Sequence, residues 1–246
     1  MIRIGVLACW LVALVVSAKP QAAEPKTEGP VVLKPARVFD GSSVEAHEGW
    51  VVLVRGEKIE QAGPADKVKV PPDARVVELP KMTLLPGLID AHTHVLLHPY
   101  NEAKWNDQVH KEAQALRVCR ATNHLRSILL SGFTTIRDLG TEGAGYADVG
   151  LKQAVEDKIV PGPRMLVVTK AIVATGSYGP KGFAPEWTLP QGAEEADGSD
   201  ALTRVTRDQI GRGADWVKVY ADAAMGGKAV RPTFSPSCPI SLEYHQ

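Results

Sequence analysis

The feature that most constrains the fold is a regular alternation of apolar β-type segments with helical segments between residues 84 and 220. Strands are expected at residues 84–90, 133–138, 164–170 and 216–220, with helices between them at 111–130, 146–157 and 202–212. Strands that alternate with helices form parallel sheets with crossover helices. The sequence therefore predicts an α/β fold with four successive β/α strand positions.

A different rhythm precedes this series, in residues 31–83. Short β-type runs are expected at 31–33, 37–39, 50–54, 58–62 and 75–79, separated by turn-forming pairs such as Asp40-Gly41 and Gly63-Pro64. Short strands punctuated by turns indicate a small β domain. The runs at 50–54 and 58–62, joined through Arg55-Gly56-Glu57, predict a hairpin.

Residues 1–18 differ from the rest of the chain. Arg3 is the only charged residue before an unbroken apolar or small stretch at 4–18. That stretch has the organisation of a secretory signal peptide and is shorter than the roughly 20 residues of a spanning helix. We expect cleavage near Ala18, periplasmic or secreted localisation, and no stable membrane association afterwards. The alternative is a retained N-terminal anchor. Residues 19–30 have the composition of a flexible linker.

The charge of the chain gives no indication of a nucleic-acid partner, and its cysteines give no indication of a disulfide. The chain has 28 basic and 28 acidic side chains and no run of Lys or Arg, so nothing in it predicts a nucleic-acid partner. After export, Cys119 and Cys238 would remain in a compartment that permits disulfides. Nothing in their spacing favours pairing, and we predict that both are unpaired.

Three polar side chains mark the end of the first expected parallel strand. Asp90, His92 and His94 alternate, so a strand places all of them on one face. Two histidines at i and i+2 can reach one metal ion, although two unrelated histidines near a loop would look the same. Asp138, at the end of the next strand, either holds the first-strand loop or is structural only. His98, His110 and His124 are predicted to be surface or helix residues rather than ligands.

The segment 174–200 is expected to be a long loop rich in Gly and Pro. Loops of this length are usually functional or disordered. It follows the third expected parallel strand, on the side where β/α barrels build their active sites.

Several motifs resemble one protein family. Leu85-Pro-Gly-Leu-Ile-Asp-Ala-His-Thr-His94 resembles the first-strand signature of the amidohydrolase superfamily. Residues 132–140 and 213–220 resemble the second and fourth strands of the branch that holds imidazolonepropionase-like proteins and Xaa-Pro dipeptidases. Residues 176–185 are also similar to those dipeptidases. The resemblance covers about residues 31–235 and implies a (β/α)8 barrel beside a small β-sandwich, of which this chain would form the N-terminal half.

The resemblance also implies a site. His92 and His94 would be ligands of a divalent metal, expected to be zinc, and Lys218 a carboxylated lysine that bridges two ions. Alternation over residues 216–220 agrees, because it places Val217 and Val219 on one face and Lys218 on the other. Burial would favour the neutral amine that reacts with carbon dioxide. The alternative is a lysine that extends to solvent from a strand end. Tyr220 is the candidate catalytic residue, placed to hydrogen-bond the substrate.

These features predict a metal-dependent hydrolase of amide bonds that acts on a small molecule or dipeptide. An Xaa-Pro dipeptidase in its intact form is favoured, with a cyclic-amide hydrolase or a non-catalytic remnant as alternatives. The sequence does not decide whether the protein forms a homo-oligomer. The later ligands of the family have no counterpart here, since His245 is the one histidine after Lys218. We therefore expect a partial barrel at 84–235, an aberrant tail at 236–246, and a chain that is inactive and poorly stable on its own.

Overall fold

The computed structural model describes residues 29–220, which belong to two compact units divided between Leu84 and Leu85. The predicted signal peptide, nearly all of the linker, Cys238 and the predicted tail lie outside the described residues. Cys119 is a free, exposed cysteine. Among residues 29–220, every helix is too short or too polar to cross a lipid bilayer.

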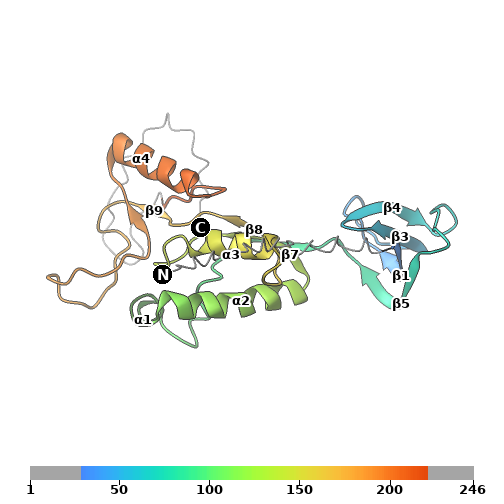
Figure 1. Ribbon diagram of the computed structural model, residues 1–246, viewed down its shortest axis with the longest axis horizontal. Helices are drawn as coiled ribbons and strands as arrows, with labels where there is room; N and C mark the ends of the chain where they lie inside the picture. The colour runs from blue at the N-terminus through green and yellow to red at the C-terminus, as the bar shows by residue number, and fades with distance from the viewer. Residues whose placement is uncertain (1–28, 221–246) are drawn as a thin grey trace, which may run out of the picture. The chain divides into compact units, whose positions relative to one another are not determined.

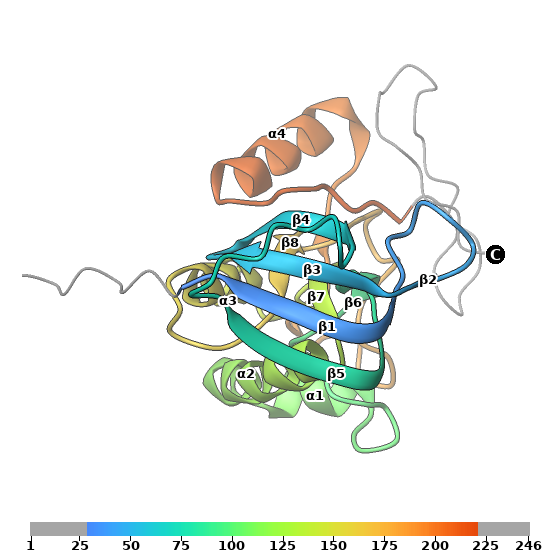
Figure 2. The ribbon, with the colours of Figure 1, turned by 90° about the vertical axis from the view of Figure 1, so that its right-hand side faces the viewer.

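The first unit is a single sheet. It contains β1 (Val31–Val38), β2 (His47–Glu48), β3 (Trp50–Arg55), β4 (Lys58–Pro64) and β5 (Arg75–Leu84). Four strands follow the order β2-β1-β3-β4, and β5 pairs in parallel with β1 (Figure 2). A small cluster of buried side chains forms the core of this unit: Val32, Val51, Leu53 and Val68.

The predicted hairpin is confirmed, whereas the prediction of two runs near the start of the unit is wrong. β3 and β4 pair antiparallel up to Arg55 and Lys58, and Gly56 turns the chain with a φ of 57°. The expected runs at 31–33 and 37–39 form one strand, β1, with Pro35 in its interior. Because proline lacks a backbone donor, the pairing with β5 shifts register just after it.

The second unit alternates strands with helices. A parallel sheet of three strands, in the order β6-β7-β8, is made of β6 (Leu88–Thr93), β7 (Phe133–Asp138) and β8 (Arg164–Val167). The helices are α1 (Trp105–Lys111), α2 (Gln114–Leu130), α3 (Ala147–Glu156) and α4 (Gly198–Gly211). This order confirms the predicted α/β class.

The helices cover the sheet with periodic apolar faces. In α2 the buried residues Ala121 and Leu125 lie four positions apart, and Arg117, four positions earlier, is buried with hydrogen bonds to the Leu96 and Thr141 carbonyls. The helix ends at Leu130 with Ser131 as its C-cap, and Gly132 follows with a φ of 94°, a conformation that suits glycine and that turns the chain into β7. Figure 1 shows α2 and α3 beside the strands, with which they share a core. That core is Val95, Leu96, Ala121, Leu125, Ile136, Ala144, Leu151, Met165 and Val167.

Several element boundaries differ from the prediction. The expected helix at 111–130 is α2, which begins at Gln114. The separate helix α1 ends at Lys111, because Glu112 has an extended backbone and its carboxylate bonds His98. The strand expected from residue 84 begins at Leu88 instead. Gly87 passes so close to Thr134 that a Cβ there would lie 2.0 Å from its Oγ1.

The fourth expected strand, residues 216–220, is reduced to one parallel bridge between Val219 and Ile172. β8 is interrupted after Val167, because Thr169 takes a left-handed conformation with a φ of 64°. The chain resumes as β9 (Ile172–Val173), which pairs with β10 (Glu194–Glu195) inside the predicted long loop. The predicted alternation is nevertheless confirmed, since Val217 and Val219 pack against the cluster that contains Val205 of α4.

Candidate active site

The end of β6 brings two histidines together. The rings of His92 and His94 meet edge to face with their centroids 5.4 Å apart. The backbone N–H of His92 donates to Asp90 Oδ1 at 3.0 Å, within the stretch of β6 where the pairing with β7 shifts register. The two imidazoles therefore lie at the carboxyl end of a parallel strand, where barrel enzymes place catalytic groups.

The orientation of the His94 ring is set by the loop after β7. Its Nδ1 lies 2.9 Å from the carbonyl oxygen of Gly140 and 3.7 Å from Glu142 Oε1. A carbonyl oxygen can only accept, so Nδ1 carries the proton and Nε2 keeps its lone pair. Burial lowers the pKa of His94, against the opposing effects of Gly140 and Glu142. A neutral imidazole with a defined tautomer is the form that binds a metal.

Asp138 is a fully buried carboxyl at the end of β7. Neither of its oxygens meets hydrogen-bond geometry with a donor in residues 29–220. The Val95 backbone N–H faces the carboxyl and acts to lower its pKa. Burial, together with the charge of Asp148, raises the pKa of Asp138 well above its usual value. The backbone beside it ties β7 to β6, because Leu139 N donates to Thr93 O at 2.8 Å.

Lys218 and Tyr220 lie on the side of their segment opposite Val217 and Val219. The Lys218 Nζ is 4.8 Å from the centre of the Tyr220 ring. The ammonium charge helps to lower the pKa of His94 and opposes the rise at Asp138. Lys218 is thus within electrostatic reach of both groups, although the two belong to different strands.

Glu142 was missed in the sequence and is the most connected carboxylate of this region. It is 3% exposed and has a φ of 50°, an unusual conformation for a residue with a side chain. Its Oε2 accepts from Trp105 Nε1 at 2.8 Å and from Tyr178 OH at 3.0 Å. The available signal was a carboxylate in the glycine-rich loop 140–145 after a parallel strand.

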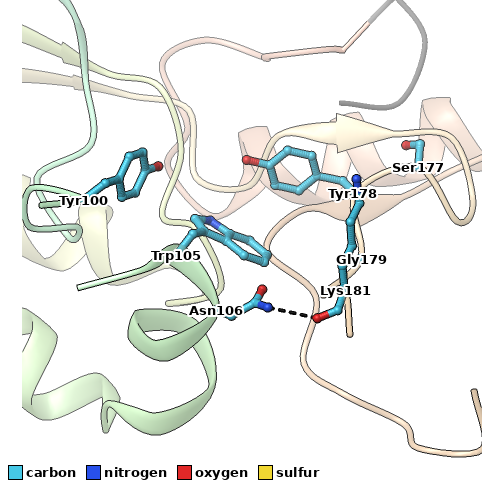
Figure 3. A pocket seen from close by; sticks show the side chains of 7 residues that line it. All are labelled: Tyr100, Trp105, Asn106, Ser177, Tyr178, Gly179 and Lys181. Carbon is cyan, nitrogen blue, oxygen red and sulfur yellow. Dashed lines mark hydrogen bonds between the residues drawn. The ribbon is translucent and has the colours of Figure 1, made fainter. Parts of the chain in front are cut away.

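A pocket opens beside Glu142. Its volume is about 370 Å³, and its lining includes Tyr100, Trp105, Asn106, Ser177, Tyr178 and Lys181. Figure 3 shows the hydroxyl groups of Tyr100 and Tyr178 facing each other across the Trp105 indole. The Tyr178 ring in turn stacks on Tyr220, with centroids 5.1 Å apart. The pocket therefore adjoins a residue that the sequence had singled out.

The other histidines have structural partners. His98 is buried, contrary to the prediction that it lies at the surface or in a helix, and its Nδ1 and Nε2 face Glu102 and Glu112 at 3.1 and 2.9 Å. His110 lies in α1 and His124 in α2, as predicted, and each bonds a backbone carbonyl.

The donors at the end of β6 suit a divalent metal in kind. His92 and His94 are imidazoles, and Asp138, at the end of β7, is a buried carboxyl with a raised pKa. Within residues 29–220, no group of three or more His, Cys, Asp or Glu has the arrangement to hold a metal ion. The described part of the chain thus supplies the histidine pair and the groups that orient it.

Comparisons with known proteins identify the family. Residues 83–242 match the Amidohydrolase family. Ochratoxinase from Aspergillus niger is 27% identical over 177 residues, which are 65% of this chain and 35% of the relative. A solved prolidase complexed with N-methylphosphonate-L-proline is 30% identical, with a TM-score of 0.66 over 85% of this chain. An Xaa-Pro dipeptidase with bound methionine is 22% identical, with a TM-score of 0.68, and shows the fold.

The match extends over part of each relative. The chain spans 35% of the length of the ochratoxinase, 49% of the prolidase and 51% of the Xaa-Pro dipeptidase. The solved neighbours are amidohydrolase (β/α)8 barrels, and this chain covers roughly half of them.

Proposed function

Because the chain belongs to the amidohydrolase family, whose members are hydrolases of carbon–nitrogen bonds and generally use divalent metals, we propose that the protein hydrolyses the amide bond of a dipeptide. The observation that carries this proposal is the paired rings of His92 and His94 at the end of β6, with Lys218 in electrostatic reach of His94. The resemblance to a prolidase at 30% identity supports a dipeptide as the substrate.

The chain's own groups have separable roles in this proposal. His92 and the Nε2 of His94 would hold the metal, expected to be zinc, while the Gly140 carbonyl fixes the His94 tautomer. Lys218 would contribute carbamate oxygens, formed when its neutral amine adds to carbon dioxide and releases a proton. A metal bound here would polarise the amide carbonyl and lower the pKa of a bound water.

Tyr220 would donate a hydrogen bond from its hydroxyl to the substrate. Its ring has two close neighbours, because it stacks on Tyr178 and its centre lies 4.8 Å from the Lys218 Nζ. An aromatic ring held in this way loses little conformational freedom when the substrate binds. Tyr220 is therefore a substrate-positioning group in this proposal.

The test compares the protein in its intact form with its His92→Asn and His94→Asn variants, using added zinc and a panel of dipeptides. Loss of an outer-shell partner of a metal costs roughly 10- to 100-fold, so we expect each variant to lose more than about 100-fold in kcat/KM. The control is His47→Asn, whose imidazole stacks on Trp50 in the first unit. Full activity in both histidine variants would refute the metal assignment. Hydrolysis of cyclic amides without release of an amino acid from any dipeptide would refute the substrate class.

A further inference from the structure

The aromatic pocket is built by two segments far apart in the chain. Tyr100 and Trp105 come from the stretch around the start of α1, whereas Tyr178 comes from the long loop after β9. The rings of Trp105 and Tyr178 meet nearly at right angles, with centroids 5.6 Å apart. Asn106 Nδ2 donates to the Lys181 carbonyl at 3.0 Å and joins the two segments (Figure 3). This hydrogen bond links the two sides of the pocket, which are not neighbours in the sequence.

Two polar groups of the walls are already paired. Trp105 Nε1 and the Tyr178 hydroxyl both donate to Glu142, which is buried. The rings of Tyr100, Trp105 and Tyr178 supply the aromatic part of the lining. A volume of about 370 Å³ is at the low end of ligand pockets, roughly 300–1,000 Å³. It suits one group of the size of an amino-acid side chain.

The charge of the lining separates two kinds of occupant. Aromatic walls can hold either a cation or a flat apolar group. The described residues that line the pocket include no carboxylate, and the nearby Glu142 already accepts hydrogen bonds from Trp105 and Tyr178. Among these lining residues no carboxylate would pair with an ammonium group, so the uncharged aromatic group is favoured.

Glu142 connects the pocket with the candidate metal ligands. Its Oε2 accepts hydrogen bonds from Trp105 and Tyr178 in the pocket wall, and its Oε1 lies 3.7 Å from His94 Nδ1. Tyr178 belongs to the pocket and also stacks on Tyr220. A substrate with its amide bond at the histidines would thus have a neighbouring side chain next to this cavity.

We propose that this pocket is a subsite for an aromatic side chain of the amide substrate. The assignment of the occupant to a substrate rests on the proposed amide hydrolysis, but binding of a ligand in the pocket can be measured without turnover. The occupant is an uncharged ring such as a benzyl group, inserted between the rings of Tyr100 and Tyr178 and against Trp105.

The experiment measures binding to the 246-residue chain in EDTA, which chelates divalent metals and so prevents metal-dependent hydrolysis. The probes are N-acetyl-L-phenylalaninamide and N-acetyl-L-alaninamide, with affinity measured by calorimetry and contact by saturation-transfer NMR. We expect the phenylalanine probe to bind about tenfold more tightly. Tyr100→Ala, which removes a wall that is 63% exposed, should reduce this preference to about threefold or less.

The matched control is Trp187→Ala. Trp187 is 64% exposed, lies in the same long loop as Tyr178, and does not line the pocket, so its removal should leave the preference unchanged. A second variant, Ser177→Trp, fills the cavity from the loop side and should abolish the preference. Equal affinity of the wild-type chain for both probes, or equal losses in the Tyr100 and Trp187 variants, would overturn the subsite. Dipeptide hydrolysis is scored separately, so that its failure counts against the proposed function alone.

Discussion

Asp148 gives a quantitative test of the structure, because it is a buried carboxyl in α3 with a raised pKa. It is fully buried, and burial raises its pKa from 3.8 to about 6, with a smaller effect of Asp215 in the same direction. Two backbone donors act against the shift, since Thr169 N and Val149 N bond its two oxygens at 2.8 and 2.9 Å. The carboxylate form is therefore a cost to the folded state near neutral pH.

The sign follows from proton linkage. The folded state binds the Asp148 proton more tightly than the unfolded state, so the contribution to stability is most favourable below pH 4. It declines as the pH rises to about 6 and is constant above that value. A difference of about two pH units between the two pKa values corresponds to about 3 kcal/mol.

The perturbation is Asp148→Asn, which keeps an oxygen for Thr169 and removes the titration. The amide nitrogen of the introduced asparagine cannot accept from Val149 N, so the variant loses one hydrogen bond at every pH. The test is therefore the change with pH: from pH 4 to pH 7 the stability of the variant relative to the wild type should rise by up to about 3 kcal/mol. Urea unfolding followed by circular dichroism at 222 nm reports the relevant unit, because every helix among residues 29–220 lies beyond Leu84.

The control variant is Glu156→Gln, an exposed carboxylate on the same helix. Its free-energy difference from the wild type at each pH gives the effect of removing an exposed carboxylate from α3. If the change of the Asp148→Asn difference between pH 4 and pH 7 were no larger than that of this control, the burial argument for Asp148 would be refuted.

Three further predictions follow from other features. Gly87→Ala should destabilise the second unit by about 1–3 kcal/mol in urea unfolding, because a Cβ would lie 2.7 Å from Thr134 Cβ; a wild-type midpoint would contradict this packing. Glu142→Ala should cost about 2–3 kcal/mol in the same assay by leaving the Trp105 and Tyr178 donors unpaired, whereas exposed Glu186→Ala should cost little. Secreted material should begin near residue 19, and N-terminal sequencing that starts at Met1 would reject the signal peptide.

Local patterns predicted those elements whose ends are marked by the sequence itself. The bounds of β7 were predicted correctly, since Gly132 precedes it and the apolar stretch ends at Asp138. The positions of His92 and Lys218 also follow from strand alternation. Local patterns do not describe contacts across the chain, and the short β9–β10 pair is an example, as its two strands are separated by the loop 174–193.

The missed site residues have the same explanation. Glu142 is held near His94 by a left-handed backbone conformation that its residue type does not suggest. Trp105 and Tyr178 are isolated aromatics in the sequence, and only the folded chain brings their rings together. The expected fourth strand failed because the turn at Thr169 interrupts its neighbour, and β-propensity does not report a break in the adjacent strand.

The bond between Asn106 and Lys181 joins residues 75 positions apart, and this separation has a kinetic consequence. Contacts that close long stretches of chain form after the intervening elements have docked, because loop-closure entropy must be overcome first. The pocket should thus be completed late in folding, after β7, α3 and β8. By the same reasoning it should open through local unfolding of the long loop while α2 stays protected. In hydrogen exchange, amides near Tyr178 would then lose protection well before those around Leu125, which lies in the buried core.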